Sequence, residues 1–196
     1  MKNILLIVDP QNDFITGSLA VEGAKEKMMK LAEYIKNEGY KYYDYICVTL
    51  DSHPEDHMSF KENGGIWPTH CVYNTNGWNI PEYLDDALSE FNDQDFKYVH
   101  IYHKGTESDT EEYSIFDNRN DGDTLANQIT DLIREGNIEI DICGIAGDYC
   151  VLETLKGLRN IIGDKYIRIL TPYVASIDHG IKLMQYTTEN QIGYVY

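Results

Sequence analysis

Short runs of almost uninterrupted apolar, β-favouring residues recur along this chain, and segments with helical periodicity separate them. The runs are Ile4–Val8, Tyr45–Leu50, Tyr98–Tyr102, Ile138–Ile145, Tyr166–Leu170 and a weaker one at Ile192–Tyr196. Strands that are apolar on both faces are typical of a parallel sheet that is covered by helices on both sides. The sequence therefore predicts an α/β fold in which right-handed crossovers connect parallel strands.

The segments between these runs are of two kinds. Helical spacing of apolar residues predicts helices over Ala24–Lys36, with Gly39 as the stop, and over Thr124–Arg134, Tyr149–Ile161 and Asp178–Gln185. Two long irregular stretches, Asp51–Pro81 and Lys104–Asp123, begin where predicted strands end. Open α/β sheets bind their ligands at this edge, and long loops in a compact domain are usually functional. We expect one domain over residues 1–196 with its site at these loops.

The charge of the chain restricts its partners. The formal net charge is −17, with 33 acidic and 16 basic residues. Such a surface repels phosphate backbones and anionic membranes, so we expect no nucleic-acid partner, no membrane partner and a small neutral or weakly charged substrate. The apolar run near the N-terminus is too short for a signal peptide, and no stretch is long enough to span a bilayer. Four cysteines without a CxxC pair are typical of reduced thiols, so we predict a cytoplasmic protein.

Histidines and an aspartate gather after the second predicted strand. Asp51 and His53 are two residues apart and can point to the same side, and His70 on the returning loop can complete the set. Imidazole and carboxylate ligands suit Zn²⁺, Fe²⁺ or Mn²⁺. His57 is either a fourth ligand or a residue that supports a ligand from outside the coordination sphere. The alternative is that Asp51 caps a turn and the histidines are ordinary surface residues.

An acid, a lysine and a thiol stand at three other predicted strand ends. Cys150 follows a strand that turns through Gly147 into a helix, where the helix start can lower a thiol pKa and free amides can hold an oxyanion. Asp9 ends the first run and can accept the thiol proton, and Lys104 follows the third run. Each has an ordinary alternative: a packed cysteine, a turn residue and a solvated lysine. Their coincidence at one edge favours a catalytic set.

Three aromatic residues lie on the same loops. Phe14, Trp67 and Tyr113 can bind a flat ring, with two of them on opposite faces of it. Simple hydrophobic closure of the loops is the alternative, and for Tyr113 it is equally plausible.

Taken together, these segments resemble the nicotinamidase branch of the isochorismatase-like hydrolases. The resemblance runs in order from the opening VDPQNDF through DSHPEDH, WPTHC, KGT with the following EEYSIFDN, and GIAGDYCV, so it covers most of the chain. It implies a six-stranded parallel sheet in a three-layer α/β/α sandwich of the Rossmann-like kind. It also implies a catalytic triad, a metal set, two backbone oxyanion donors and a cis peptide before the first donor. The triad falls on Asp9, Lys104 and Cys150, and the metal set falls on Asp51, His53 and His70. The oxyanion donors fall on the backbone amides of Ala146 and Cys150, with the cis peptide before Ala146.

The resemblance further implies hydrolysis of nicotinamide to nicotinate and ammonia through a cysteine thioester. One divalent metal would hold the pyridine nitrogen while Phe14 and Trp67 sandwich the ring. Zinc is expected in preference to iron or manganese. Two positions depart from the family pattern: Ser52 replaces a frequent tryptophan, and Gly147 replaces a usual threonine. Three alternatives remain: a related amidohydrolase of ureido or carbamoyl compounds, a catalytically idle binding protein, and a redox-sensing thiol protein. A homo-oligomer is compatible with the sequence, which does not specify one.

Overall fold

A single six-stranded parallel sheet, in the order β3-β2-β1-β4-β5-β6, forms the centre of the molecule. The computed structural model describes residues 1–163 and 166–195. The strands are β1 (Lys2–Val8), β2 (Tyr45–Asp51), β3 (Tyr98–Lys104), β4 (Ile138–Ile145), β5 (Ile167–Ala175) and β6 (Gly193–Val195). The parallel sheet predicted from the uninterrupted apolar runs is therefore confirmed. Tyr196, the last residue of the sixth predicted strand, lies outside the described residues.

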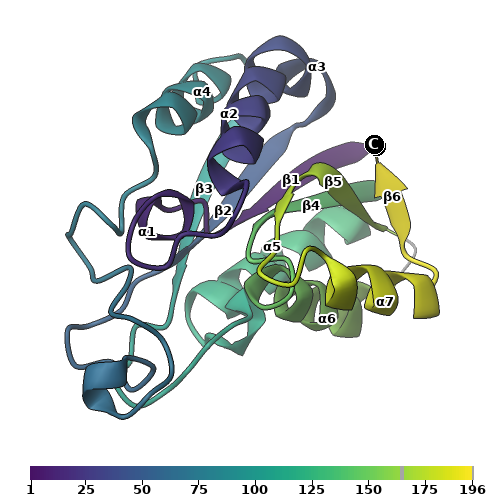
Figure 1. Ribbon diagram of the computed structural model, residues 1–196. Helices are drawn as coiled ribbons and strands as arrows, with labels where there is room; N and C mark the ends of the chain where they lie inside the picture. Colours follow the sequence, from purple (N-terminus) through teal and green to yellow (C-terminus); the bar gives the residue numbers. More distant parts are fainter. Residues whose placement is uncertain (164–165, 196) are drawn as a thin grey trace.

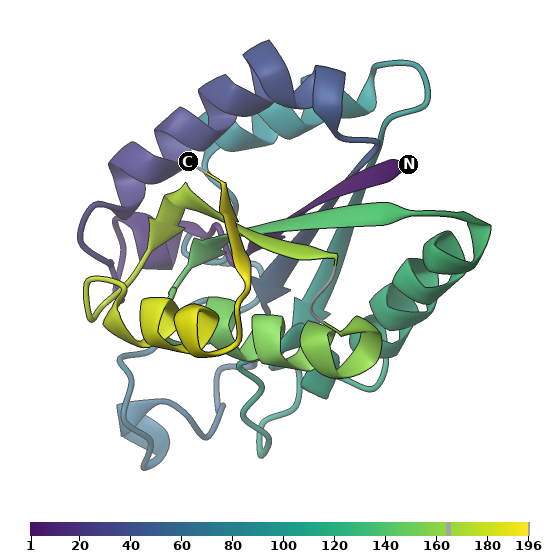
Figure 2. The same cartoon turned by 90° about the vertical axis from the view of Figure 1, so that its right-hand side faces the viewer.

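Helices cover the sheet on both faces and complete an α/β/α sandwich (Figure 1). The helices are α1 (Asn12–Ile15), α2 (Ala24–Tyr34), α3 (Tyr40–Tyr42), α4 (Glu82–Asn92), α5 (Asp121–Glu135), α6 (Cys150–Ile162) and α7 (Ile181–Glu189). One layer contains α2, α3 and α4, and the other contains α5, α6 and α7, as Figure 2 shows from the side. In the described part of the chain, no helix is long and apolar enough to cross a membrane.

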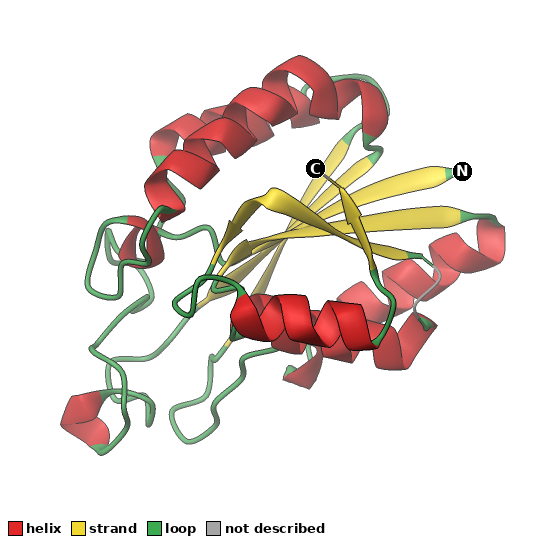
Figure 3. Cartoon of the chain, turned by 45° about the vertical axis from the view of Figure 1, so that its right-hand side comes forward, coloured by secondary structure: helices red, strands yellow, loops and turns green. Residues whose placement is uncertain are grey.

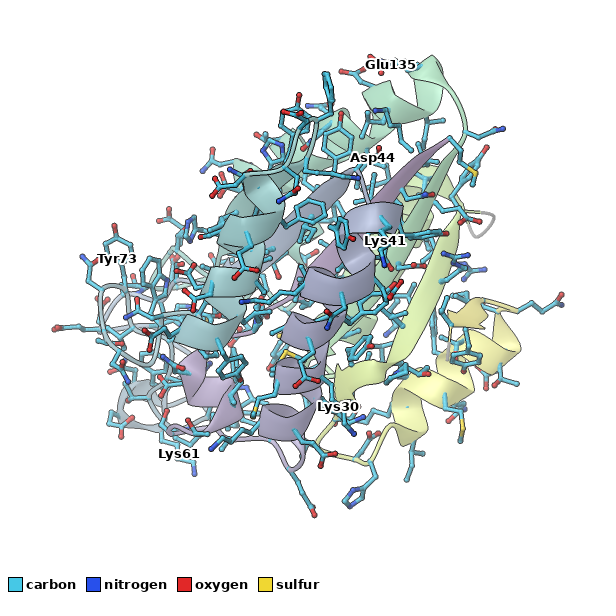
Figure 4. All side chains as sticks on the ribbon, turned by 90° about the horizontal axis from the view of Figure 1, so that it is seen from above. Lys30, Lys41, Asp44, Lys61, Tyr73 and Glu135 are labelled. Atoms are coloured by element: carbon cyan, nitrogen blue, oxygen red, sulfur yellow. The ribbon has the colours of Figure 1, made fainter. Side chains whose placement is uncertain are left out.

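The register of the central strands determines where the loops after them meet. Val8 at the end of β1 lies beside Thr49 of β2 and Gly144 of β4, and Asp51 of β2 lies beside Lys104 of β3. The long loops over residues 52–81 and 105–120 leave the sheet at this same edge (Figure 3). Figure 4 labels Lys61 and Tyr73 on the first of these loops, far from Glu135, which precedes β4 at the opposite edge.

Several predicted boundaries need correction. Gly39 does not stop the first long helix, because its backbone is helical (φ −57°) and the chain continues from α2 through a π-helical turn, Ile35–Gly39, into α3. The fifth strand is longer than predicted: it continues past Pro172 to Ala175, where it pairs with the end of β4. Helix α4 was not predicted, although its buried face repeats at helical spacing. Two short 3₁₀ turns, Lys61–Asn63 and Ile115–Asp117, interrupt the long loops.

Candidate active site

Four neighbouring strands deliver four reactive side chains to one place. Asp9 follows β1, Asp51 ends β2, Lys104 ends β3, and Cys150 begins α6 after the turn that leaves β4. All four side chains are almost completely buried. Asp9 has a left-handed backbone (φ 49°), a conformation that aspartate tolerates better than most residues. The structure therefore brings the predicted acid, lysine and thiol together.

The ammonium group of Lys104 lies at the centre of this cluster. Its Nζ is 2.8 Å from Asp9 Oδ2 and 3.7 Å from Cys150 Sγ, and it donates a hydrogen bond to Asp51 Oδ1. Carboxylate oxygens of the two aspartates and the Cys150 sulfur all lie within 4.8 Å of one another. These three ligands could hold a cation, and the cation that the structure places among them is the lysine.

Burial and this lysine set the protonation of the cluster. Burial raises the pKa of Asp9 even though the nearby Lys104 charge opposes the change. Burial also disfavours the charge of Lys104, but Asp51 and Asp9 outweigh it and raise the lysine pKa well above its ordinary value. For Asp51, burial is outweighed by Lys104 and His53, which hold its pKa well below the usual range. A carboxylate with a raised pKa is suited to accept a proton from a thiol.

The thiol itself corrects one expectation. The helix start was expected to lower the pKa of Cys150, but burial raises it well above the ordinary value, and Asp9 and Asp51 add to this effect against Lys104. The thiol is therefore protonated at rest. Because a thiol is a weak nucleophile until it loses its proton, Cys150 needs a base beside it, and Asp9 is in place to act as one.

The turn before Cys150 has the conformation that the family resemblance implied. The peptide bond between Ile145 and Ala146 is cis. Amides around the turn donate to backbone carbonyls: Gly147 N to Ala175 O at 2.7 Å and Val151 N to Ala146 O at 3.0 Å. These bonds fix the chain around Ala146, which lines the same pocket as Cys150.

Three side chains beside this cluster form a group of potential metal ligands. Asp51, His53 and His70 each offer one ligand atom within 4.8 Å of the others. His53 Nδ1 donates to Gly105 O and His70 Nδ1 donates to Pro68 O, both at 2.8 Å. Because a carbonyl only accepts hydrogen bonds, each neutral ring keeps its Nε2 lone pair free for a metal. Within the described residues, His53 Nε2 is buried and has no hydrogen-bond partner. This environment is the one expected of a nitrogen that binds a metal.

His57 has a different environment. Its Nδ1 is 2.8 Å from Ser59 Oγ, and its Nε2 donates to Thr110 O at 3.0 Å, so both ring nitrogens are engaged. Burial lowers the pKa of His57 to about 4. The ring stacks on His53 with 3.9 Å between the centroids. Of the two predicted roles, this geometry favours support of a ligand over coordination.

Backbone and side-chain contacts hold the potential metal ligands in position. Gln11 brackets Asp51: its Oε1 accepts from Asp51 N at 2.8 Å, and its Nε2 donates to Asp51 O at 2.7 Å. Gly105 has a positive φ of 63°, and a Cβ there would lie 2.4 Å from His53 Cε1. Only glycine therefore lets the carbonyl of residue 105 approach the His53 ring.

A pocket opens in front of these groups. Its lining includes the three aromatic residues predicted from the sequence, Phe14, Trp67 and Tyr113, and it reaches Asp51, His70 and Cys150. Trp67 Nε1 donates to Tyr113 Oη at 3.0 Å, so Tyr113 holds the indole in position.

Sequence reasoning missed several residues of the pocket. Tyr149 packs against Trp67, with 5.1 Å between the ring centroids, and Glu111 has a pKa that burial and Asp51 raise. Tyr149 directly precedes Cys150 and Glu111 is two residues before Tyr113, and this proximity is the signal that could have found them. Leu19, Val21 and Ile177 complete the wall. These three are apolar residues in loops, and no local pattern distinguishes them.

Comparisons with known proteins agree with this architecture. The nicotinamidase/pyrazinamidase of Mycobacterium tuberculosis is 32% identical over 178 residues, which cover 88% of this chain and 87% of the relative. The crystal structure of the pyrazinamidase of Pyrococcus horikoshii in complex with zinc superposes with a TM-score of 0.76 at 30% identity, covering 100% of this chain and 99% of the other. The yeast nicotinamidase bound to the inhibitor nicotinaldehyde gives a TM-score of 0.81 at 25% identity, covering 98% and 99%. No family model matches the chain.

The sheet, its helical layers and these structural neighbours define an isochorismatase-like α/β protein. Within that class, the chain belongs to the nicotinamidase/pyrazinamidase family.

Proposed function

We propose that this protein is a nicotinamidase, which hydrolyses nicotinamide to nicotinate and ammonia. The observation that carries the proposal is the buried cluster of Asp9, Lys104 and Cys150 beside the ligand group of Asp51, His53 and His70, in a chain of this family. The yeast nicotinamidase with bound nicotinaldehyde supports a small pyridine compound as the ligand.

The chemistry of the chain follows from the cluster. Asp9 accepts the thiol proton of Cys150, and the thiolate attacks the carboxamide carbon. The amides of Ala146 and Cys150 hold the oxygen that becomes negative. Lys104 keeps Asp9 oriented, Asp9 returns the proton to the departing ammonia, and a water molecule then cleaves the Cys150 thioester to release nicotinate.

The pocket walls would orient the substrate for this attack. Phe14 and Trp67 offer flat apolar surfaces on which a pyridine ring can stack, and Tyr113 fixes the indole through its hydroxyl. Burial of the whole cluster keeps bulk water away from the thiolate.

Asp51, His53 and His70 fit a divalent metal ion, because their free ligand atoms converge and carbonyl anchors orient the two imidazoles. When bound, the ion would supply a Lewis-acidic contact for the pyridine nitrogen. A relative crystallised with zinc supports zinc before iron or manganese.

Substitution of a ligand should lower the metal content of the purified protein. We expect His53→Ala and His70→Ala each to reduce bound zinc well below the wild-type stoichiometry, because two remaining ligands bind a divalent ion weakly. Elemental analysis by mass spectrometry measures this directly. His100→Ala is a matched control that should retain the metal, since His100 lies on β3, away from the ligand group. Full zinc in both ligand variants would place the metal elsewhere.

Three amides test the proposed substrate. We expect rapid ammonia release from nicotinamide and from pyrazinamide, which keeps a nitrogen at the same ring position. Benzamide stacks equally well but lacks this nitrogen, so its kcat/KM should be about a hundredfold lower, a loss of roughly 2–3 kcal/mol. A coupled ammonia assay at neutral pH, with and without a chelator, provides the comparison. Benzamide turned over as fast as nicotinamide would favour the carbamoyl-amidohydrolase alternative.

The single domain over residues 1–196, the cytoplasmic location and a homo-oligomer stay predictions.

A further inference from the structure

Thr49 makes a side-chain contact to the proposed base that the mechanism above does not use. This residue lies in β2, beside Val8, and is fully buried. Its Oγ1 donates a hydrogen bond to Asp9 Oδ1 at 2.7 Å and accepts one from Asp9 N at 3.3 Å. Asp9 N also donates to the backbone carbonyl of Thr49 at 3.0 Å. The backbone of Asp9 is therefore anchored independently of the threonine hydroxyl.

The two oxygens of the Asp9 carboxylate have different partners, because the Thr49 hydroxyl bonds to one of them. Oδ1 is held by Thr49, while Oδ2 lies 2.8 Å from Lys104 Nζ. The same Nζ is 3.7 Å from the sulfur of Cys150, and a carboxylate oxygen of Asp9 lies within 4.8 Å of that sulfur, so Oδ2 shares its lysine with the thiol. Rotation of the carboxylate about its Cβ–Cγ bond would break both contacts together.

The strand itself does not need this hydroxyl. Thr49 stands between Val48 and Leu50, in a strand of buried apolar residues, where valine has the same branched shape and a high strand propensity. A hydroxyl inside such a strand needs a polar partner, because a buried polar group without one is destabilising. Here the partner is the side chain of the proposed base.

We propose that Thr49 is a positioning residue, which locks the Asp9 carboxylate so that Oδ2 faces Cys150 and takes the thiol proton. The inference rests on the proposed cysteine mechanism and adds to it a second group, beside Lys104, that orients the base. Thr49 is not among the described residues that line the pocket. Its effect is on the rate at which Cys150 becomes a thiolate.

The variants Thr49→Val and Thr49→Ser test the inference. Valine keeps the shape and removes the hydroxyl, so kcat for nicotinamide should fall about ten- to a hundredfold while KM stays within about twofold. Serine keeps the hydroxyl and should restore most of kcat. Thr187→Val is a matched control, since Thr187 is equally buried and hydrogen-bonded but lies on α7.

A second measurement does not depend on turnover. Iodoacetamide reacts with thiolates, so its rate of reaction with Cys150, followed by peptide mass spectrometry, reports proton transfer to Asp9. We expect this rate to fall about tenfold or more in Thr49→Val, with unchanged zinc content, and to recover in Thr49→Ser.

Wild-type kcat and alkylation rate in Thr49→Val would overturn the inference. Equal losses in the serine and valine variants, accompanied by loss of zinc or a raised KM, would also overturn it, because they indicate a role in folding alone. If the wild-type protein released no ammonia from nicotinamide, the proposed function would fail. The alkylation comparison would still decide the role of Thr49.

Discussion

Cys150→Ala should abolish hydrolysis of nicotinamide, with kcat reduced at least about 10⁴-fold. Cys150 supplies the only sulfur of the described residues that lines the pocket, and no neighbouring group replaces it as nucleophile. The side chain is small and lies at the start of α6, so its loss removes few packing contacts. The fold and the zinc content should therefore be unchanged. Ammonia release, circular dichroism and elemental analysis on one preparation measure the three quantities.

Cys143→Ala is the matched control for this variant. Cys143 is also buried, and it lies in the middle of β4, beside Ile7 of β1, away from the pocket lining. Activity should survive this substitution. Turnover by the Cys150→Ala protein at the wild-type rate would exclude the thioester mechanism altogether.

Lys104→Met should inactivate the enzyme and also destabilise it strongly. Lys104 is fully buried and contacts the carboxylates of both Asp9 and Asp51. Methionine fills a similar volume but leaves two buried acids without their shared cation. Removal of one partner from a buried ionic group costs about 3–5 kcal/mol in the free energy of unfolding. Urea unfolding at neutral pH measures the loss, on zinc-loaded and chelator-treated protein in parallel.

An exposed lysine provides the comparison for this result. Lys30 pairs with Glu26 on the surface of α2, so Lys30→Met should leave the unfolding midpoint unchanged. If Lys104→Met were as stable as the wild type, the two carboxylates would not depend on the lysine. The assignment of Lys104 as the centre of the cluster would then be wrong.

Most of the fold could be predicted because its central strands β1, β2 and β4 are buried on both faces. Such strands are uninterrupted apolar runs in the sequence, and the reactive residues stand at or shortly after their ends, as Asp51 does at the end of β2 and Asp9 does after Val8. Because the strands are parallel, the loops that follow them leave the sheet at one edge. Gly39 shows where local reasoning fails: glycine is permitted in a helix, and the segment Ile35–Gly39, whose two end residues are buried, packs against α4, a contact that no local pattern records.

The protonation of the site residues and their roles toward a metal were less predictable than which residues form the site. The position of Cys150 at a helix start favours a lowered pKa, yet burial beside two carboxylates reverses the direction. Whether His57 coordinates a metal depends on its hydrogen bonds to Ser59 and Thr110, and the second of these partners is far away in the sequence. Such outcomes depend on distances between separate segments, which residue spacing does not contain.

The placement of the cluster across β3, β2, β1 and β4 has a consequence for how the protein matures. Asp9, Lys104 and Cys150 come from segments that are far apart in the chain, and they meet only after three parallel pairings have formed. Non-local parallel pairings form late and slowly during folding. A nascent chain therefore cannot expose a reactive thiolate activated by Asp9 until the four central strands are assembled, so the fold itself delays the onset of cysteine reactivity.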